Sequence, residues 1–135
     1  MSSKNQEQLE ARIRELEPPY ESEAEAQIGR AFDRHVVPFF YRQARLIYHD
    51  GYLDIWRPTY TLPTYDSLVI EYAAPNTGLD YAQRGRIYQA NGIPTVVATP
   101  ADLEQRGWEG RLLRSVDTAY QNARSAWYRE QWRER

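Results

Sequence analysis

The stretch RPTYTLPTYDSLVIEYAAPN, residues 57–76, decides the fold of this chain because it contains its most strand-like segment. Its part SLVIEYAA is apolar on both alternating faces, which is typical of a central strand covered on both sides. The preceding TLPTYD predicts a turn into that strand. One residue of the strand, Glu71, is charged, and burying a carboxylate without compensation is costly. The sequence therefore predicts a central strand whose buried acid needs a partner.

The segment after this strand predicts a helix and a second buried strand. A loop, PNTGLD, leads into the helix YAQRGRIYQANG, which closes at Asn91 and Gly92 as helices commonly do. The run IPTVVAT is again apolar, and we expect it to lie parallel to the first strand because a helix connects the two. Pro100 begins a turn, PADLEQRG, and apolar residues at helical spacing from Leu112 to Trp127 predict a long final helix.

The upstream half predicts two helices and a hairpin. A short amphipathic helix and its linker occupy residues 1–19 and end at a Pro-Pro pair. The next helix begins where Ser22 and Glu25 have the spacing of a capping box. Strand-like runs near 40–49 and 52–57, joined by an Asp-Gly pair, predict an antiparallel hairpin. The order helix, three strands, helix, strand, helix predicts an α/β fold with a mixed central sheet flanked by helices.

The composition is that of a small globular protein. The chain has 135 residues, enough for one domain, which we assign to residues 20–135. No run approaches the roughly 18 apolar residues of a membrane span, so we expect no membrane partner and a cytoplasmic location. The absence of cysteine leaves carboxylates and two histidines as metal ligands.

The charge distribution argues against a broadly basic nucleic-acid binder. The formal net charge is -2 and the pI is about 5.7. Of 17 basic residues the only lysine is Lys4, so the predicted domain contains arginine alone. The arginines of the final helix are spread around it instead of forming one stripe, which weakens the prediction of a dedicated DNA-binding face.

The element order and four motifs resemble the PD-(D/E)xK, or restriction-endonuclease-like, nuclease superfamily, especially its small very-short-patch-repair-endonuclease-like members. The motifs are SEAEAQIGRAF in the first domain helix, RPTYTLP where the family has a Pro-Asp-Phe-Thr-Leu-Pro type of run, LVIEYA, and YAQRGRIYQANGIPTVV. The resemblance covers about residues 20–105. It implies a restriction-endonuclease-like fold and metal-dependent cleavage of DNA.

The resemblance also implies roles for four positions. In this superfamily a helix glutamate and two strand acids bind Mg²⁺, and a lysine two residues after the second acid helps to place and activate water. Position by position, Glu25 is the helix acid and Glu71 is the second strand acid. Thr59 stands where the first strand aspartate belongs, and Ala73 stands where the lysine belongs. The motif is degenerate at these two positions, so we expect Mg²⁺ binding through the two glutamates to be weak or absent.

Several alternatives stay open at the level of sequence. Arg84 or Arg86 could bind Glu71, or a phosphate, in place of a metal, but a guanidinium cannot act as a base. Asp54 and Asp66 are candidates for the lost acid. The leading hypothesis is a pseudoenzyme of the nuclease superfamily, weak or inactive, that retains nucleic-acid or protein binding. The alternative is an active Mg²⁺-dependent DNA endonuclease that uses the two glutamates and a relocated third group. The partners consistent with these hypotheses are DNA and, through the terminal helices, a second copy of the chain.

Overall fold

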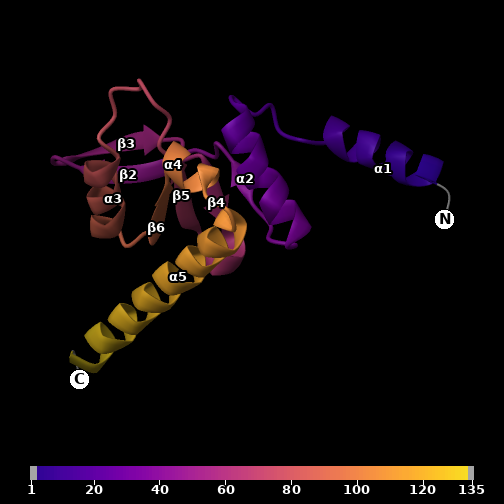
Figure 1. The fold of residues 1–135 in the computed structure, drawn as a ribbon. Helices are drawn as coiled ribbons and strands as arrows, with labels where there is room; N and C mark the ends of the chain where they lie inside the picture. Colours follow the sequence, from indigo (N-terminus) through magenta and orange to yellow (C-terminus); the bar gives the residue numbers. More distant parts are fainter. Residues whose placement is uncertain (1–2, 134–135) are drawn as a thin grey trace.

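The computed structural model describes residues 3–133 and shows a mixed α/β fold (Figure 1). The helices are α1 (Ser3–Glu15), α2 (Glu23–Arg34), the 3-10 helix η1 (Pro63–Tyr65), α3 (Tyr81–Ala90), α4 (Pro100–Glu104) and α5 (Trp108–Arg133). The strands are β1 (Phe40–Tyr41), β2 (Arg45–His49), β3 (Tyr52–Trp56), β4 (Tyr60–Leu62), β5 (Leu68–Tyr72) and β6 (Thr95–Ala98). The predicted linker and domain also include residues 1, 2, 134 and 135, which lie outside the described residues.

The central sheet is mixed, as predicted, and has the strand order β1-β4-β5-β6. Strand β5 pairs antiparallel with β4 and parallel with β6, so that Ile70 lies between Tyr60 and Val96. The predicted parallel pair joined by a helix is therefore confirmed, with α3 as the connection.

The Asp50–Gly51 pair forms the turn of the predicted hairpin, β2–β3. Both residues have positive φ, 51° and 84°, which is what a two-residue turn between twisted strands requires and glycine adopts readily. The hairpin forms a two-stranded sheet of its own, however, and does not join the central sheet. Ile47 on its inner face is fully buried against Val69 and Tyr88, so packing of this face fixes the hairpin beside α3.

The predicted order of elements was wrong in three places. The run near 40–49 is divided between β1 and β2, because Arg42 has a φ of 56° and redirects the chain. The segment TLPTYD contains the end of β4 and then η1, since Thr61 pairs with β5. The segment PADLEQRG contains α4, which a capping box of Thr99 and Asp102 starts. Five strands, not three, thus lie between α2 and α3.

Two apolar layers cover the central sheet. On one face α2 and α5 pack on alternate residues of β4 and β5, and the buried cluster consists of Ile28, Phe32, Tyr60, Leu62, Leu68, Ile70, Tyr72, Ala98, Leu112 and Val116. On the other face α3 and the hairpin enclose Ile47, Val69, Tyr88 and Ile93. Glu71 belongs to this second face because it alternates with Ile70 and Tyr72 along β5. The acid therefore enters the smaller core, beneath α3.

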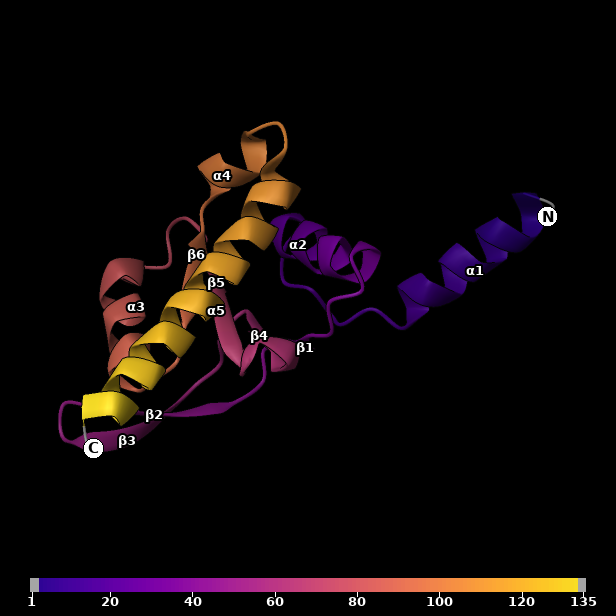
Figure 2. The same cartoon turned by 90° about the horizontal axis from the view of Figure 1, so that it is seen from below.

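The two terminal helices extend beyond the body of the domain. Figures 1 and 2 show α1 projecting away from the sheet and the second half of α5 running past it. Leu9 and Leu16 are mostly exposed, as are Trp127 and Trp132. None of the helices formed by residues 3–133 combines the length and apolar character needed to cross a lipid bilayer.

Candidate functional site

Glu71 is buried on β5 and has two polar partners on α3. Arg84 donates from Nε to Glu71 Oε2 at 3.4 Å, and the Tyr88 hydroxyl donates to Glu71 Oε1 at 3.1 Å. Arg84 and Tyr88 are four residues apart, which places both on the same side of the helix. Of the two arginines considered from the sequence, the structure brings Arg84 to the acid, whereas Arg86 is exposed to solvent.

The surroundings of Glu71 have opposing effects on its ionisation. Burial is the largest effect and raises the pKa of the Glu71 carboxyl above its ordinary value. The positive charge of Arg84, the hydroxyl of Tyr88 and the backbone of Thr59 act in the other direction and lower that pKa. Arg84 is itself held in place, because its guanidinium lies 4.1 Å from the centre of the Trp56 ring. The carboxylate is thus balanced by a fixed cation.

Thr59 lies beside Glu71 but uses its hydroxyl for a structural bond. Continuing the β4–β5 register by one residue places Thr59 opposite Glu71 on the same face of the sheet. Its Oγ1 accepts a hydrogen bond of 3.0 Å from the backbone N–H of Tyr72. The side chain is buried and uncharged, so it supports β5 where the resemblance would require a metal-binding aspartate.

Glu25 is buried at the start of α2 and is held by a different arginine. Arg42 donates from Nη2 to Glu25 Oε1 at 2.7 Å, and the Tyr41 hydroxyl donates to the same oxygen at 3.3 Å. The hydroxyl of Ser22 caps the helix by accepting from the backbone N–H of Glu25 and also donates to Glu25 Oε2 at 3.1 Å. Like Glu71, Glu25 is therefore a buried carboxylate that is already bound to a guanidinium.

The two glutamates share none of these partners, and the remaining candidates lie elsewhere. Ala73 follows β5, and its backbone N–H donates to Ala98 at 2.8 Å. Asp54 belongs to the hairpin, where its carboxylate accepts from the indole N–H of Trp56 at 3.2 Å. Asp66 is exposed after η1 with a φ of 56°. The structure thus brings Thr59 to Glu71, but neither aspartate replaces the missing acid there.

The donor set does not fit a Mg²⁺ site. Mg²⁺ prefers an octahedral shell of oxygen ligands and gives up its water reluctantly. Each glutamate is bound to an arginine, and the hydroxyl of Thr59 accepts from the backbone. Within the described part of the chain, no group of three histidine, aspartate, glutamate or cysteine residues is arranged to hold a metal ion. The charged atoms of the arrangement are guanidiniums and carboxylates that are already paired with each other.

Residues of the site that were missed from the sequence include Tyr88, Trp56 and Arg42. Tyr88 could have been found, because it lies four residues after Arg84 on a helix that faces an acid. Trp56 stands directly before the RPTYTLP motif, but only the separate packing of the hairpin brings it over the guanidinium. Arg42 gave no signal, since its contact with Glu25 depends on the turn at its own positive φ.

Comparisons with family models, with curated proteins and with solved structures find no match for this chain. The resemblance to the nuclease superfamily stays a prediction from the four motifs. What the structure itself shows is an α/β fold with a mixed sheet in which two buried glutamates are each paired with an arginine.

Proposed function

We propose that this protein is a non-catalytic relative of the PD-(D/E)xK nucleases that acts by binding a nucleic acid or a protein and not by cleaving DNA. One observation carries the proposal. Of the three positions where the resemblance implies a metal-binding carboxylate, two keep the acid, and each of these acids is paired with an arginine: Glu25 with Arg42 and Glu71 with Arg84. A guanidinium supplies positive charge, but unlike a metal ion it cannot coordinate and activate a water molecule, and it cannot act as a base.

The energetics of the two ion pairs support this reading. For Mg²⁺ to bind, each arginine would have to leave a carboxylate that is almost fully buried. Separating such a pair costs about 3–5 kcal/mol when nothing replaces the cation, and the metal would first have to make good this loss. The ion would also have to lose part of its own hydration, and Thr59 offers it no negative charge in return. Two occupied carboxylates and a neutral hydroxyl are therefore a poor substitute for three free acids.

The alternative, an active Mg²⁺-dependent endonuclease using Glu25, Glu71 and a relocated third group, predicts a different response to the metal. Isothermal titration calorimetry with MgCl₂ separates the two hypotheses. We expect the natural protein and a Glu71→Gln variant to give the same heats as dilution up to 10 mM Mg²⁺, well above the range of about 1 mM expected for a weak site. A saturable heat with a Kd of about 1 mM or lower that is lost in Glu71→Gln would overturn the proposal.

A further inference from the structure

Strand β6 forms one edge of the central sheet and is open on its outer side. It pairs with β5 on one side, and no strand formed by residues 3–133 pairs with the other. The carbonyls of Pro94 and Ala98 accept from the β5 side at 2.9 and 2.8 Å. Because the backbone groups of a strand alternate in direction, those of Thr95 and Val97 point to the open edge. Such an edge is a template for another strand.

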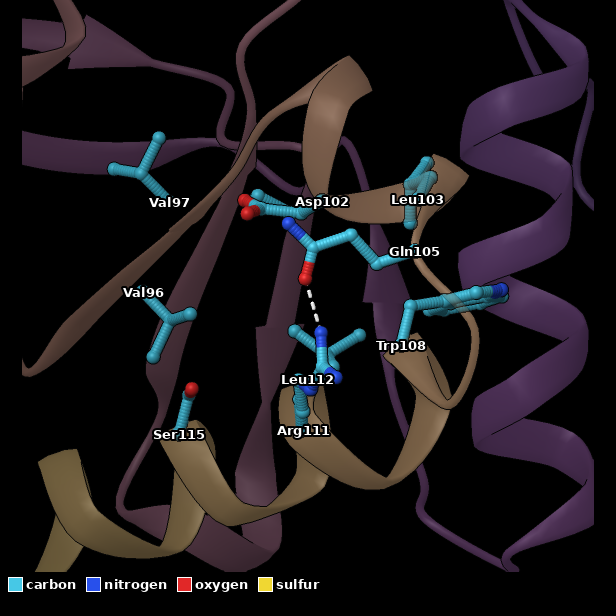
Figure 3. Close-up of a pocket in the computed structure, with 10 residues that line it drawn as sticks. Val96, Val97, Asp102, Leu103, Gln105, Trp108, Arg111, Leu112 and Ser115 are labelled. Atoms are coloured by element: carbon cyan, nitrogen blue, oxygen red, sulfur yellow. Dashed lines mark hydrogen bonds between the residues drawn. The ribbon is translucent and has the colours of Figure 1, made fainter.

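A groove runs along this edge between β6 and α5. Two adjoining hollows of about 330 and 580 Å³ share Val96, Arg111 and Ser115 in their walls. Figure 3 shows the first of them, with Val96 and Val97 on one side of the space and Arg111 on the other. Apolar side chains of α4 and α5 form its deeper wall, among them Leu112. The groove therefore combines free backbone groups with an apolar floor and a polar rim.

The charge of the groove is positive along the helix. Arg111 and Arg114 line the second hollow, and no acidic residue does. The first hollow contains Asp102, but its carboxylate is used to cap α4 by accepting from the backbone N–H of Thr99 at 2.8 Å. An extended ligand with carboxylates on the side facing α5 would complement the two arginines.

We infer that this groove binds an extended acidic segment of a partner protein by strand addition to β6. The backbone of the segment pairs with Thr95 and Val97, and its alternate acidic side chains reach Arg111 and Arg114. A second copy of the chain fits less well, because pairing β6 with β6 would bring the same arginines of both copies together. A nucleic acid would leave the backbone groups of the open edge without strand partners.

Fluorescence anisotropy with a labelled nine-residue peptide of alternating glutamate and threonine tests this inference. Val97→Pro removes the outward N–H, a change that an edge position tolerates, and should weaken binding by about tenfold or more. Val97→Ala keeps the N–H and should stay within about twofold. Arg111→Glu should also weaken binding by about tenfold, whereas Arg129→Glu, farther along α5 and outside the groove, should have little effect. Circular dichroism checks that each variant is folded.

A modified peptide tests the natural protein directly, in case Val97→Pro fails to fold. Methylation of every second backbone nitrogen blocks pairing on one edge of the peptide, so one of the two methylation registers should abolish binding. Three results would overturn the inference: no binding of the peptide at 1 mM, equal binding of both methylated peptides, or tighter binding of a twelve-nucleotide single-stranded DNA that Arg111→Glu weakens. The inference would also be wrong if sedimentation showed self-association of the natural protein that Val97→Pro prevents, because the ligand of β6 would then be a second copy of the chain. These results do not depend on Mg²⁺, so this test and that of the proposed function fail independently.

Discussion

Replacing Arg84 by alanine should destabilise the protein by about 3 kcal/mol. The side chains of Arg84 and Glu71 are only 17% and 6% exposed, so solvent screens their interaction little. Removing one partner of a buried pair costs about 3–5 kcal/mol, because the other is left as an uncompensated charge. The pair is long at 3.4 Å, and Tyr88 still donates to the carboxylate, which places the expected loss at the lower end of this range. Loss of the contact with Trp56 contributes in the same direction.

Urea unfolding followed by circular dichroism at pH 7 measures this loss. The corresponding decrease in Tm is about 10 °C for a domain of this size. Arg86→Ala is the matched control, because Arg86 lies on the same helix but is exposed. Its effect should stay within about 0.5 kcal/mol.

A double-mutant cycle then shows whether the loss arises from the buried charge. Adding Glu71→Gln to Arg84→Ala should recover part of the stability, because the neutral amide leaves no charge in the core. A loss below about 0.5 kcal/mol for Arg84→Ala, or strict additivity of the two substitutions, would refute the reasoning that the arginine compensates the acid.

Three further predictions concern the pH dependence of stability, the packing of two glycines and the effect of an added acid. Burial raises the pKa of Glu71 above its unfolded value of about 4.3, so the folded state holds this proton more tightly than the unfolded state. The free energy of unfolding of the natural protein, minus that of Glu71→Gln, should therefore decrease as the pH rises from about 4 through the folded pKa. Urea unfolding across this range would contradict this if that value stayed constant or increased. Gly29→Ala should cost about 1–3 kcal/mol in the same assay, since its Cβ would overlap two tyrosine hydroxyls, whereas Gly85→Ala has open space and should be neutral or stabilising. Thr59→Asp alone should not restore Mg²⁺ binding, because Arg42 and Arg84 still hold the two glutamates; 10 mM Mg²⁺ should leave its thermal stability unchanged, whereas a site with a Kd of about 1 mM would stabilise the fold by about 1.4 kcal/mol. Stabilisation of this variant by Mg²⁺, or Mg²⁺-dependent plasmid nicking by it, would show that the arginines do not block the site.

The elements that were predicted correctly are those with local signals. The capping hydroxyl of Ser22 starts α2, and the Asp50–Gly51 turn closes the hairpin. The apolar runs of β5 and β6 and the helix between them define the parallel pair. In each case neighbouring residues are sufficient to determine the structure.

The misassigned elements depend on contacts between distant residues. Strand β1 has two residues, and its pairing with β4 spans about 20 positions, so no periodicity can reveal it. The hairpin leaves the central sheet because Ile47 packs under α3, which is a matter of tertiary structure. The site follows the same division: an arginine near residue 85 was expected for Glu71, but Arg42 was not expected for Glu25.

The central claim is that Glu25 and Glu71 are each held in an ion pair with an arginine, which leaves no working metal site. Plasmid nicking by the purified natural protein, with and without 10 mM Mg²⁺, tests it most directly, with Glu71→Ala as the matched control for contaminating nucleases. We expect the same low level of nicked plasmid from both proteins under both conditions. Mg²⁺-dependent nicking by the natural protein that Glu71→Ala abolishes would contradict the claim and establish the active endonuclease instead.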